Sequence, residues 1–205
     1  MAYLGRDRIL ERKSELFYDS SFDPDSVRQS SYDLRLGEEF YIVGKKAPER
    51  LSAKQPYLTL QPGQFAILTC YEMLHLPNDV IGFITLRNRF KMQGLVNVSG
   101  FHVDPTFDGR LVFAVQNIGP SDVRLKYQDQ SFTIFFADVD KGSGKRPDPP
   151  RTGILLTDVH QLGANSITLS KLKKDIDTVK TALLIYAPFA VALFIALIMN
   201  IVKSK

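Results

Sequence analysis

Short apolar or alternating runs, separated by turn residues, fill the chain between positions 32 and 138. These runs are YDLRL, EFYIV, YLTL, QFAILTCY, VIGFITL, RLVFAVQN, DVRLKY and SFTIFFADV. The turns between them include Pro62-Gly63, Pro77-Asn78-Asp79, Asp108-Gly109 and Gly119-Pro120. Many short strands at this spacing are typical of an all-β barrel or sandwich. Ahead of them, residues 6–19 predict one short amphipathic helix, whose apolar side holds Ile9, Leu10, Leu16 and Phe17.

The pattern changes near the C-terminus, where residues 181–202 read TALLIYAPFAVALFIALIMNIV. These 22 residues carry no charge and lie between Lys180 and Lys203. As a helix rising about 1.5 Å per residue they would span about 33 Å, enough for a hydrocarbon core of about 30 Å. A buried core helix is the alternative, but such helices are usually shorter. The segment therefore predicts a transmembrane helix, in which Pro188 is better tolerated than in a soluble one.

Two further segments connect this helix to the strands. Residues 141–165 are predicted to be a linker, because their first part, KGSGKRPDPPRTG, holds three prolines, three glycines and no apolar side chain. Residues 166–180 are predicted to be an amphipathic helical stalk, which lies on the bilayer or associates with parallel copies under an oligomeric head. The spacing that indicates it is 3, 4, 3 and 4 along Leu169, Leu172, Ile176, Val179 and Leu183.

Composition and charge narrow the function classes. Of 205 residues, 44% are hydrophobic and 23% charged, which excludes wholesale disorder. The net charge is +4, and six lysines and two aspartates follow position 170. The first 170 residues therefore hold 20 basic residues (26 less 6) and 20 acidic residues (22 less 2), and their net charge is zero. The excess charge thus flanks the apolar segment, and no nucleic-acid partner is predicted. One cysteine, Cys70, excludes a disulfide scaffold and is expected to be a core residue.

The same lysines predict an orientation in the membrane. Four of them precede the apolar segment within about ten residues and two follow it, which favours a cytoplasmic globular domain on a single-pass C-terminal anchor. The first residues, MAYLGRDRILERK, are charged and do not resemble a secretion signal.

Four stretches, in order, resemble the dCTP deaminase family. Residues 22–37 contain its S-x-D-L-R-L-G signature, ending at Gly37. The segment Leu76-Pro77 with residues 81–83 resembles the strand before the family's G-R-S-S phosphate motif. Residues 102–109 (HVDPTFDG) resemble its I-D-P-G-F-x-G motif, and residues 123–136 resemble its last strand pair. The resemblance covers about residues 4–138. It implies a mainly β fold, the distorted β-barrel of the dUTPase and dCTP deaminase type, in homotrimers with nucleotide between subunits. Residues 1–140 are the predicted barrel domain.

The resemblance also locates the catalytic position. In the family a glutamate lies five residues past the final glycine of the I-D-P-G-F-x-G motif. The corresponding glycine here is Gly109, and five residues past it lies Ala114. The strand at 110–117 has no carboxylate at all. Deamination needs a group that takes a proton from water and returns one to ammonia, which a methyl side chain cannot do. A zinc-activated water is excluded as well, since the sequence has one cysteine and no H-x-E motif.

Several binding positions survive in altered form. The phosphate motif reads Leu86-Arg87-Asn88-Arg89, so the resemblance implies that Arg87, Asn88 and Arg89 hold phosphates. It implies that His102 and Asp104 contact the nucleotide, and in a dUTPase-type mechanism Asp104 would position the attacking water. For each a structural alternative stays open: a solvated loop for the arginines, a surface histidine, and a turn aspartate before Pro105. Ser31 and Asp33 are expected to satisfy backbone groups in a turn.

Three functions remain on this reading. The first is a membrane-anchored, nucleotide-binding protein that has lost deamination and acts as a sensor or regulator. The second is an active enzyme, either a dCTP deaminase or a dUTP diphosphatase using Asp104. The third is a trimeric scaffold on a membrane. No protein metal site is predicted, and Mg²⁺ is expected only as the companion of a bound triphosphate.

Overall fold

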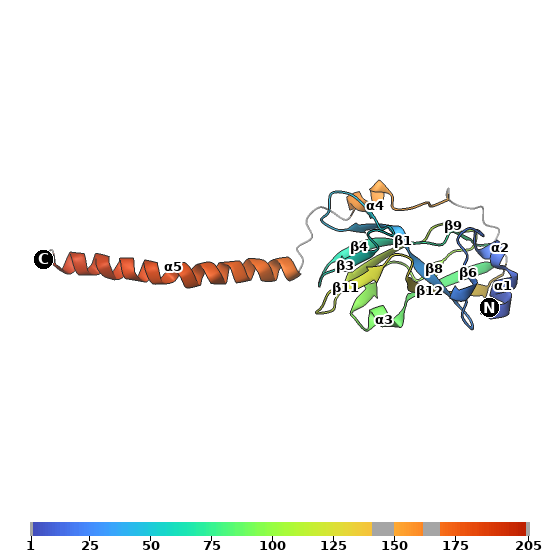
Figure 1. Cartoon of the computed structure of the whole chain (residues 1–205), viewed down its shortest axis with the longest axis horizontal. Helices are drawn as coiled ribbons and strands as arrows, with labels where there is room; N and C mark the ends of the chain where they lie inside the picture. The colour runs from blue at the N-terminus through green and yellow to red at the C-terminus, as the bar shows by residue number, and fades with distance from the viewer. Residues whose placement is uncertain (1, 141–149, 162–168, 204–205) are drawn as a thin grey trace. The chain divides into compact units, whose positions relative to one another are not determined.

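The computed structural model describes residues 2–140, 150–161 and 169–203, which fall into two units, residues 1–166 and 167–205 (Figure 1). The helices are α1 (Arg6–Glu11), α2 (Lys13–Leu16), α3 (Asn88–Lys91), α4 (Leu156–Gln161) and α5 (Leu169–Lys203), and a 3₁₀ turn covers Pro24–Ser26. The strands are β1 (Tyr32–Ile42), β2 (Glu49–Arg50), β3 (Tyr57–Leu60), β4 (Phe65–Cys70), β5 (Leu74–His75), β6 (Val80–Leu86), β7 (Leu95–Asn97), β8 (His102–Val103), β9 (Asp108–Gly109), β10 (Val112–Asn117), β11 (Val123–Lys126) and β12 (Gln130–Asp138).

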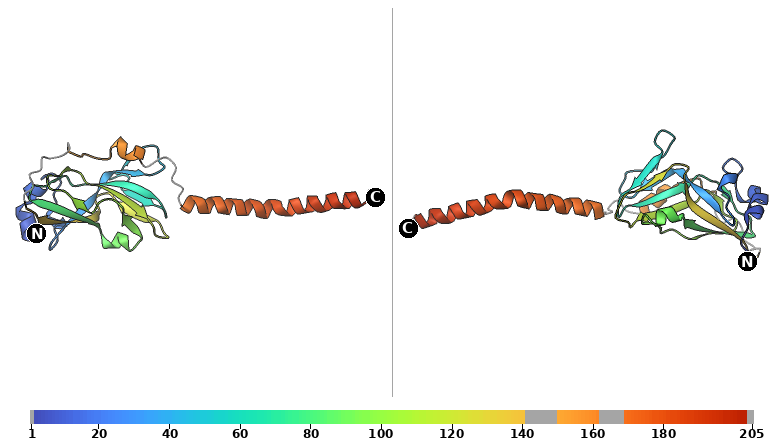
Figure 2. Two further views of the ribbon diagram at one scale, coloured as in Figure 1. Left: turned by 180° about the vertical axis from the view of Figure 1, so that it is seen from behind. Right: turned by 60° about the horizontal axis from the view of Figure 1, so that its bottom comes forward.

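The strands of the first unit form one large curled sheet and two small ones (Figures 1 and 2). The large sheet runs in the order β7-β10-β4-β1-β12-β6-β8, with β2 added to β1. The small sheets pair β11 with β3 and β5 with β9, and every named pair is antiparallel. The prediction of a mainly β, distorted barrel with short helices is confirmed: YDLRL and EFYIV together form β1, and each of the other predicted runs forms a strand of its own.

The long strand β1 joins the two halves of the large sheet. Its first part pairs with β12 and its second part with β4, with register shifts after Leu34 and after Leu36. Gly37 lies at this crossing. A Cβ there would approach the backbone oxygen of Cys70 to 2.5 Å and Oγ1 of Thr69 to 2.6 Å. Only glycine therefore allows β1 and β4 to lie this close, which accounts for the end of the D-L-R-L-G run.

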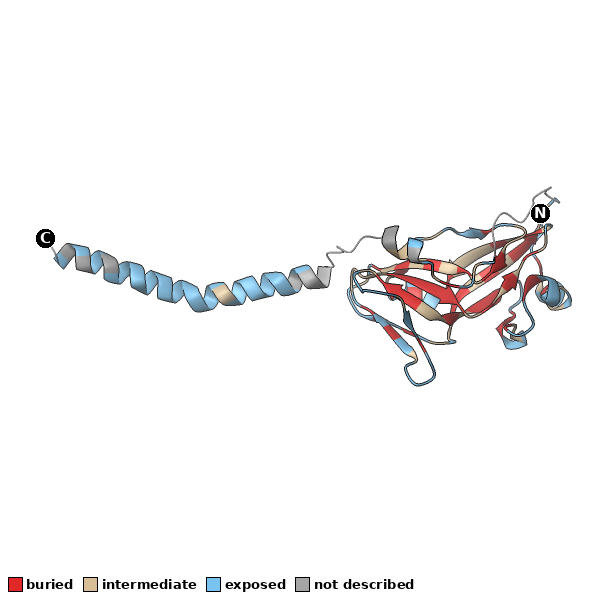
Figure 3. Cartoon of the chain, turned by 90° about the horizontal axis from the view of Figure 1, so that it is seen from above, coloured by how far each residue is buried: buried red, intermediate tan, exposed pale blue. Residues whose placement is uncertain are grey.

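Aromatic rings fill the centre of the barrel. Phe113 of β10 and Phe132 of β12 stack with ring centroids 3.7 Å apart and an interplanar angle of 9°. Next to α2, Phe17 packs on Tyr32 with ring centroids 4.5 Å apart, and both side chains are buried. Figure 3 shows that the buried positions lie along the strands. Burial of these large apolar surfaces drives the association of strands that are distant in sequence.

The N-terminal segment differs from the single helix predicted for residues 6–19. It forms α1 and α2, which are separated at Arg12, and Phe17 leaves the helix in an extended conformation that bridges Leu74. The break lies at Arg12, whose backbone leaves the helical conformation (φ −94°, ψ 11°) and whose side chain donates to Asp79 at 2.9 Å and to Asp138 at 3.3 Å. The predicted apolar side is buried at Ile9, Leu16 and Phe17 and partly buried at Leu10.

Residues 150–161, which lie in the predicted linker, pack against the barrel, and we call them the strap. The N–H of Arg110 donates to the carbonyl oxygen of Arg151 at 2.6 Å, and the N–H of Arg151 donates to that of Asp108 at 3.1 Å, which extends β9 by a parallel bridge. The N–H of Ile154 donates to Oε2 of Glu39 at 3.1 Å. The rest of the predicted linker, 141–149 and 162–165, lies outside the described residues.

The second unit is the single helix α5, which covers most of the predicted stalk and all of the predicted transmembrane segment. Within it, Lys174–Ala196 is long and apolar enough to cross a membrane. Its apolar side chains are exposed, among them Leu184 at 78%, Phe189 at 72% and Leu193 at 70% (Figure 3). The helix continues through Pro188. It has the length and composition of a membrane span.

Candidate functional site

The first group of predicted site residues lies where β6 ends and α3 begins. Nη1 of Arg87 donates to Oδ2 of Asp33 and, at 2.7 Å, to Oε1 of Gln130. Arg28 approaches the same two acceptors, with Nε 2.6 Å from Oδ2 of Asp33 and Nη2 2.8 Å from Oε1 of Gln130. Two guanidinium groups therefore converge on one buried carboxylate and one amide oxygen.

Asp33 has a different role from the one expected. The sequence predicts that it satisfies backbone groups in a turn, but its carboxylate accepts from the side chains of Arg28, Arg87 and Thr133, the last at 2.8 Å. The reason is its place in the sheet, since β1 pairs Asp33 with Thr133 of β12 and the side chain lies beside the end of β6. Asp33 therefore fixes both arginines and neutralises only part of their charge.

Arg89 joins this group from α3. Its Nη2 donates to the carbonyl oxygen of Gln130 at 2.9 Å and approaches Oδ2 of Asp129 at 3.4 Å. Asn88 is exposed beside it. The side chains of Arg28, Arg87 and Arg89 are 47%, 31% and 49% exposed, so each guanidinium reaches solvent as well as its protein acceptors. We call Arg28, Arg87 and Arg89 the arginine cluster. Its three cations face two carboxylates, which leaves an excess positive charge.

His102 of β8 and Asp104, just after this strand, form a second, separate group. Nε2 of His102 lies 3.4 Å from Oδ1 of Asp104, and the side chains are 44% and 76% exposed. The ring of His102 also contacts that of Phe101, at 5.1 Å between centroids. Among the residues that the structure describes, no hydrogen bond or ion pair joins this group to the arginine cluster. A single chain thus brings Arg87 and Arg89 together but leaves His102 and Asp104 apart from them.

Ala114, at the predicted catalytic position, lines a third place, a pocket of about 230 Å³. The barrel contributes apolar side chains and one hydroxyl to its wall, and the strap contributes two charged side chains: Phe65, Ile67, Val112, Ala114 and Ser99 from the barrel, with Arg151 and Asp158 from the strap. Nη2 of Arg151 donates to Oδ2 of Asp158. The ionisable groups of this pocket therefore belong to a segment that the sequence predicts to be linker.

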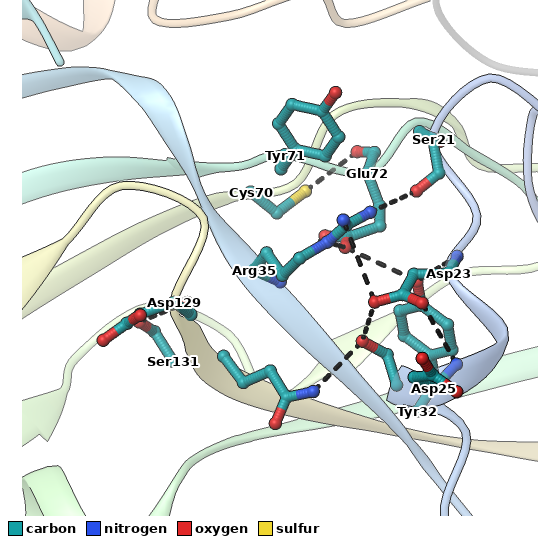
Figure 4. A network of polar contacts seen from close by, with 12 residues as sticks. Ser21, Asp23, Asp25, Tyr32, Arg35, Cys70, Tyr71, Glu72, Asp129 and Ser131 are labelled. Carbon is teal, nitrogen blue, oxygen red and sulfur yellow. Dashed lines mark hydrogen bonds and ion pairs between the residues drawn. The ribbon is translucent and has the colours of Figure 1, made fainter. Parts of the chain in front are cut away.

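A polar network includes the buried Glu72, which the sequence analysis missed, and it continues through Asp23 and Ser26 to Gln130 beside the arginine cluster (Figure 4). Glu72 is fully buried. It accepts from Nε of Arg35 at 2.7 Å, from the N–H of Arg35 at 2.9 Å and from the hydroxyl of Tyr32 at 3.5 Å. Burial raises the pKa of Glu72 to about 7, although the hydrogen bond and the charge of Arg35 act to lower it.

The network is structural, because it ties β1 to the segments on either side. Arg35 also donates from Nη2 to the carbonyl oxygen of Ser21 at 2.6 Å, and its guanidinium lies over the ring of Tyr71, 4.6 Å from the centroid. The one available signal in the sequence was a carboxylate in the otherwise apolar stretch after β4. For Arg151 and Asp158 no such signal exists.

The single cysteine is part of the core, as predicted. Cys70 is buried, its thiol donates to the carbonyl oxygen of Glu72 at 3.1 Å, and its sulfur accepts from the N–H of Leu111 at 3.1 Å. Burial raises the pKa of the thiol further above its usual range. Cys70 therefore has neither the exposure nor the ionisation that a nucleophile requires. Within the described part of the chain no group of three or more His, Cys, Asp or Glu is placed to hold a metal.

Comparison with known proteins places this geometry in a family context. The family whose sequence model matches is described as dCTP deaminase-like, and the match covers residues 4–139. The dCTP deaminase of Thermococcus kodakarensis is 33% identical over 126 residues, which are 62% of this chain and 78% of that protein. The dCTP deaminase of Pyrococcus horikoshii is 28% identical over 153 residues, 75% of this chain and 89% of that protein.

A solved structure has a similar fold. The 2'-deoxycytidine 5'-triphosphate deaminase of Agrobacterium tumefaciens superposes with a TM-score of 0.55 at 18% identity, over 65% of this chain. The match spans about half of that chain, 48%. The family match ends at residue 139, so Arg151 and Asp158 lie outside the residues that it covers.

Proposed function

This chain belongs to the dCTP deaminase-like family, and from that premise we propose that it binds a deoxynucleoside triphosphate as a catalytically inactive sensor or regulator held at a membrane. The observation that carries the proposal is the wall of the pocket at Ala114. Among the described residues this pocket receives from the barrel four apolar side chains and the hydroxyl of Ser99, and it holds no free proton-exchanging group, because its one carboxylate, Asp158 of the strap, accepts from Arg151 and from the N–H of Leu155. Hydrolytic deamination requires such a group beside the attacked carbon.

The arginine cluster supports binding of phosphate. Guanidinium groups present several N–H donors in a fixed plane that matches the oxygens of a phosphate. Asp33 and Gln130 hold Arg28 and Arg87 in place, so little conformational entropy is lost when a triphosphate binds. The described residues offer no cage of carboxylates for a cation. Mg²⁺ would therefore be held by the triphosphate oxygens and water, the usual arrangement for this ion.

Exposed aromatic side chains support the proposed homotrimer. Tyr3 and Phe101 are 61% and 65% exposed and lie around Phe83 of β6, with ring centroids 6.3 Å from it in both cases. Phe135 of β12 lies 6.4 Å from Tyr3 on the same face. A cluster of rings at the surface is typical of a protein interface. Association of subunits is also what would bring the arginine cluster, His102 with Asp104, and the Ala114 pocket into one site.

The helix α5 supports attachment to a membrane, because Lys174–Ala196 meets the length and polarity requirements of a span. The excess of lysines before the apolar segment favours a barrel in the cytoplasm. The stalk residues Leu172, Ile176 and Val179 are 47%, 45% and 59% exposed. In a trimer they would pack as the a and d positions of a short parallel coiled coil. Signalling would further require that nucleotide binds two arrangements of the head with different affinity.

The test measures binding and catalysis in the same samples. The full chain, purified in a mild detergent, is mixed with dCTP, dUTP or dTTP and Mg²⁺, and both its melting temperature and the release of ammonia and pyrophosphate are followed. We expect a rise in melting temperature without product. Arg87→Met should abolish the rise, and Arg50→Met is the matched control, because Arg50 is 68% exposed and pairs with Glu38 and Glu39 away from the cluster. No rise with any nucleotide at millimolar concentration would favour the scaffold function.

A second candidate is a dUTP diphosphatase, which the exposure of Asp104 favours. Its carboxylate is 76% exposed beside His102 and so is accessible to a water molecule and a magnesium triphosphate. This reaction needs no carboxylate at position 114. Release of pyrophosphate from dUTP that is lost in Asp104→Asn would establish this function in place of the inactive one.

A further inference from the structure

The helix α5 carries one exposed apolar face that continues from the stalk into the membrane span, and its spacing and charges fit a second copy of the same helix. We propose that α5 packs in parallel against α5 of the other copies along one continuous seam, which runs from Leu172 to Leu193. In each contact Asp175 of one copy pairs with Lys180 of the next. This inference deepens the proposed function: it rests on attachment to a membrane and names the surface through which the anchored copies associate independently of their barrels.

The seam consists of positions that alternate four and three residues apart along α5. They are the a and d positions of successive heptads: Leu172, Ile176, Val179, Leu183, Tyr186, Ala190 and Leu193. A repeat that averages 3.5 residues keeps such positions on one face of a helix that coils around its neighbours. All seven residues are exposed in the single chain. The seam therefore offers a continuous apolar surface to a partner helix.

The unbroken course of α5 argues against the bilayer surface as the cover for the stalk part of the seam. The helix runs from Leu169 to Lys203 with only a shallow bend (Figure 2). If residues 181–202 fill the hydrocarbon core, the preceding part of α5, about 12 residues, extends about 18 Å beyond that core. A helix that follows the direction of the span carries Leu172 and Ile176 away from the lipid tails. Another copy of α5 is then the surface that can cover them.

The charges beside the seam are complementary between parallel copies. Copies that insert in the same direction are parallel, and in a parallel coiled coil the g position of one helix lies beside the e position of the next heptad in its neighbour. Asp175 directly precedes Ile176 and Lys180 directly follows Val179, so they occupy g and e. Both side chains are exposed, and within the described part of the chain neither forms an ion pair. Packing in register therefore places each carboxylate beside an ammonium group of the next copy.

The opposite face of the stalk is polar, and its hydroxyl groups are bonded within the helix. Lys174 and Thr181 lie at the f position, which is farthest from the seam. The hydroxyl of Thr181 donates to the carbonyl oxygen of Asp177 at 2.8 Å, and that of Thr178 donates to the carbonyl oxygen of Lys174 at 2.9 Å. The stalk thus has one apolar face for a partner and one polar face for water.

Disulfide cross-linking of the full chain in phosphatidylcholine vesicles tests the seam. The natural cysteine, Cys70, is buried, so an added cysteine is the one that reacts. With a lipid-soluble oxidant, Val179→Cys and Leu193→Cys should form covalent dimers at least about tenfold faster than Thr181→Cys and Ile195→Cys, because a disulfide requires the two Cα atoms to approach within about 7 Å. The latter two are the matched controls, since each lies two residues further along α5 at an f position.

Charge variants of the Val179→Cys protein test the pairing. Asp175→Lys places like charges side by side and should slow cross-linking by about threefold to tenfold at low salt, while Asp177→Lys, on the outer face, should not. Combining Asp175→Lys with Lys180→Asp exchanges the two charges and should restore the rate. In about 1 M salt the slowing should diminish, because exposed charges are screened. Equal rates in Asp175→Lys and Asp177→Lys would overturn the pairing of Asp175 with Lys180.

The outcomes separate this inference from the proposed function. Phe101→Asp places a charge in the exposed aromatic cluster of the barrel and should leave cross-linking at position 179 unchanged, since α5 associates independently. Equal rates at seam and f positions, or loss of cross-linking in Phe101→Asp, would overturn the inference, and the proposed function would still stand if nucleotide raised the melting temperature. Selective cross-linking without any effect of nucleotide would support the seam and contradict nucleotide binding. A chain that does not remain with the vesicles would contradict membrane attachment and the seam together.

Discussion

Glu72 gives the barrel a pH dependence whose direction can be worked out from its surroundings. The side chain is fully buried, and burial raises its pKa from 4.5 to about 7 although Arg35 stabilises the charged form. A group with a higher pKa in the folded protein binds more protons there than in the unfolded chain between these two values. Its contribution to stability is therefore complete below pH 4.5 and is lost as the pH rises through 7.

The size of the effect follows from the same values. A tenfold change in a proton-binding constant corresponds to about 1.4 kcal/mol, so a rise from 4.5 to about 7 makes about 3 kcal/mol of stability depend on pH. Between pH 5 and pH 8 we expect the free energy of unfolding of the wild type to fall by about 2–3 kcal/mol relative to Glu72→Gln. Glutamine has the same shape and can still accept from Arg35, but it does not titrate.

Urea unfolding of the two proteins, followed by circular dichroism at several pH values, measures this difference directly. Taking the difference between wild type and Glu72→Gln removes the contributions of all other titrating groups. A constant difference across the range would show that the pKa of Glu72 is unchanged on folding. A wild type that becomes relatively more stable with rising pH would show that Arg35 outweighs burial, which would refute the reasoning.

Three further predictions follow from close contacts and exposure. Gly37→Ala should lower the free energy of unfolding by at least about 2 kcal/mol in the same urea assay, because its Cβ would lie 2.5 Å from the backbone oxygen of Cys70. Gly100→Ala is the control: a Cβ at Gly100 would meet no atom within 4 Å, so the free energy of unfolding should change by less than about 0.5 kcal/mol. Cys70 should not react with a thiol reagent in the native protein and should react fully in urea, as absorbance of the released product would show. Leu193→Lys should shift the chain from the membrane to the soluble fraction on alkaline extraction, at a cost of about 2.5–3.5 kcal/mol for insertion. Ser121→Lys, at an exposed position of the barrel, should not.

Periodicity was sufficient to predict most of the fold. Strands such as β10 and β12 hold buried positions interspersed with half-buried ones, and their signals depend on local sequence alone. The position of Ala114 could likewise be counted from Gly109. These features share a cause, because a strand's pattern and a motif's spacing are both contained within a few residues.

Long-range contacts account for what the sequence did not predict. Asp33 was expected to serve a turn, but its distant partners Arg87 and Thr133 become neighbours only when β12 pairs with β1 and β6. Arg151 lies in a stretch rich in proline and glycine whose composition is that of a linker. Its docking depends on backbone hydrogen bonds to β9, which involve no side-chain pattern at all.

The shared strand β1 has a consequence for how such a protein can change. A single residue inserted near the start of β1 would turn every later side chain of this strand to the opposite face of the sheet. Because β1 pairs with β12 and then with β4, both halves of the sheet would be affected. Gly37 adds a second restriction, since the close approach to β4 leaves no room for a side chain. Variation in length is therefore confined to turns and to segments beyond β12. The strap and α5 both lie there, where new capabilities can be added without disturbing the frame that holds the pocket.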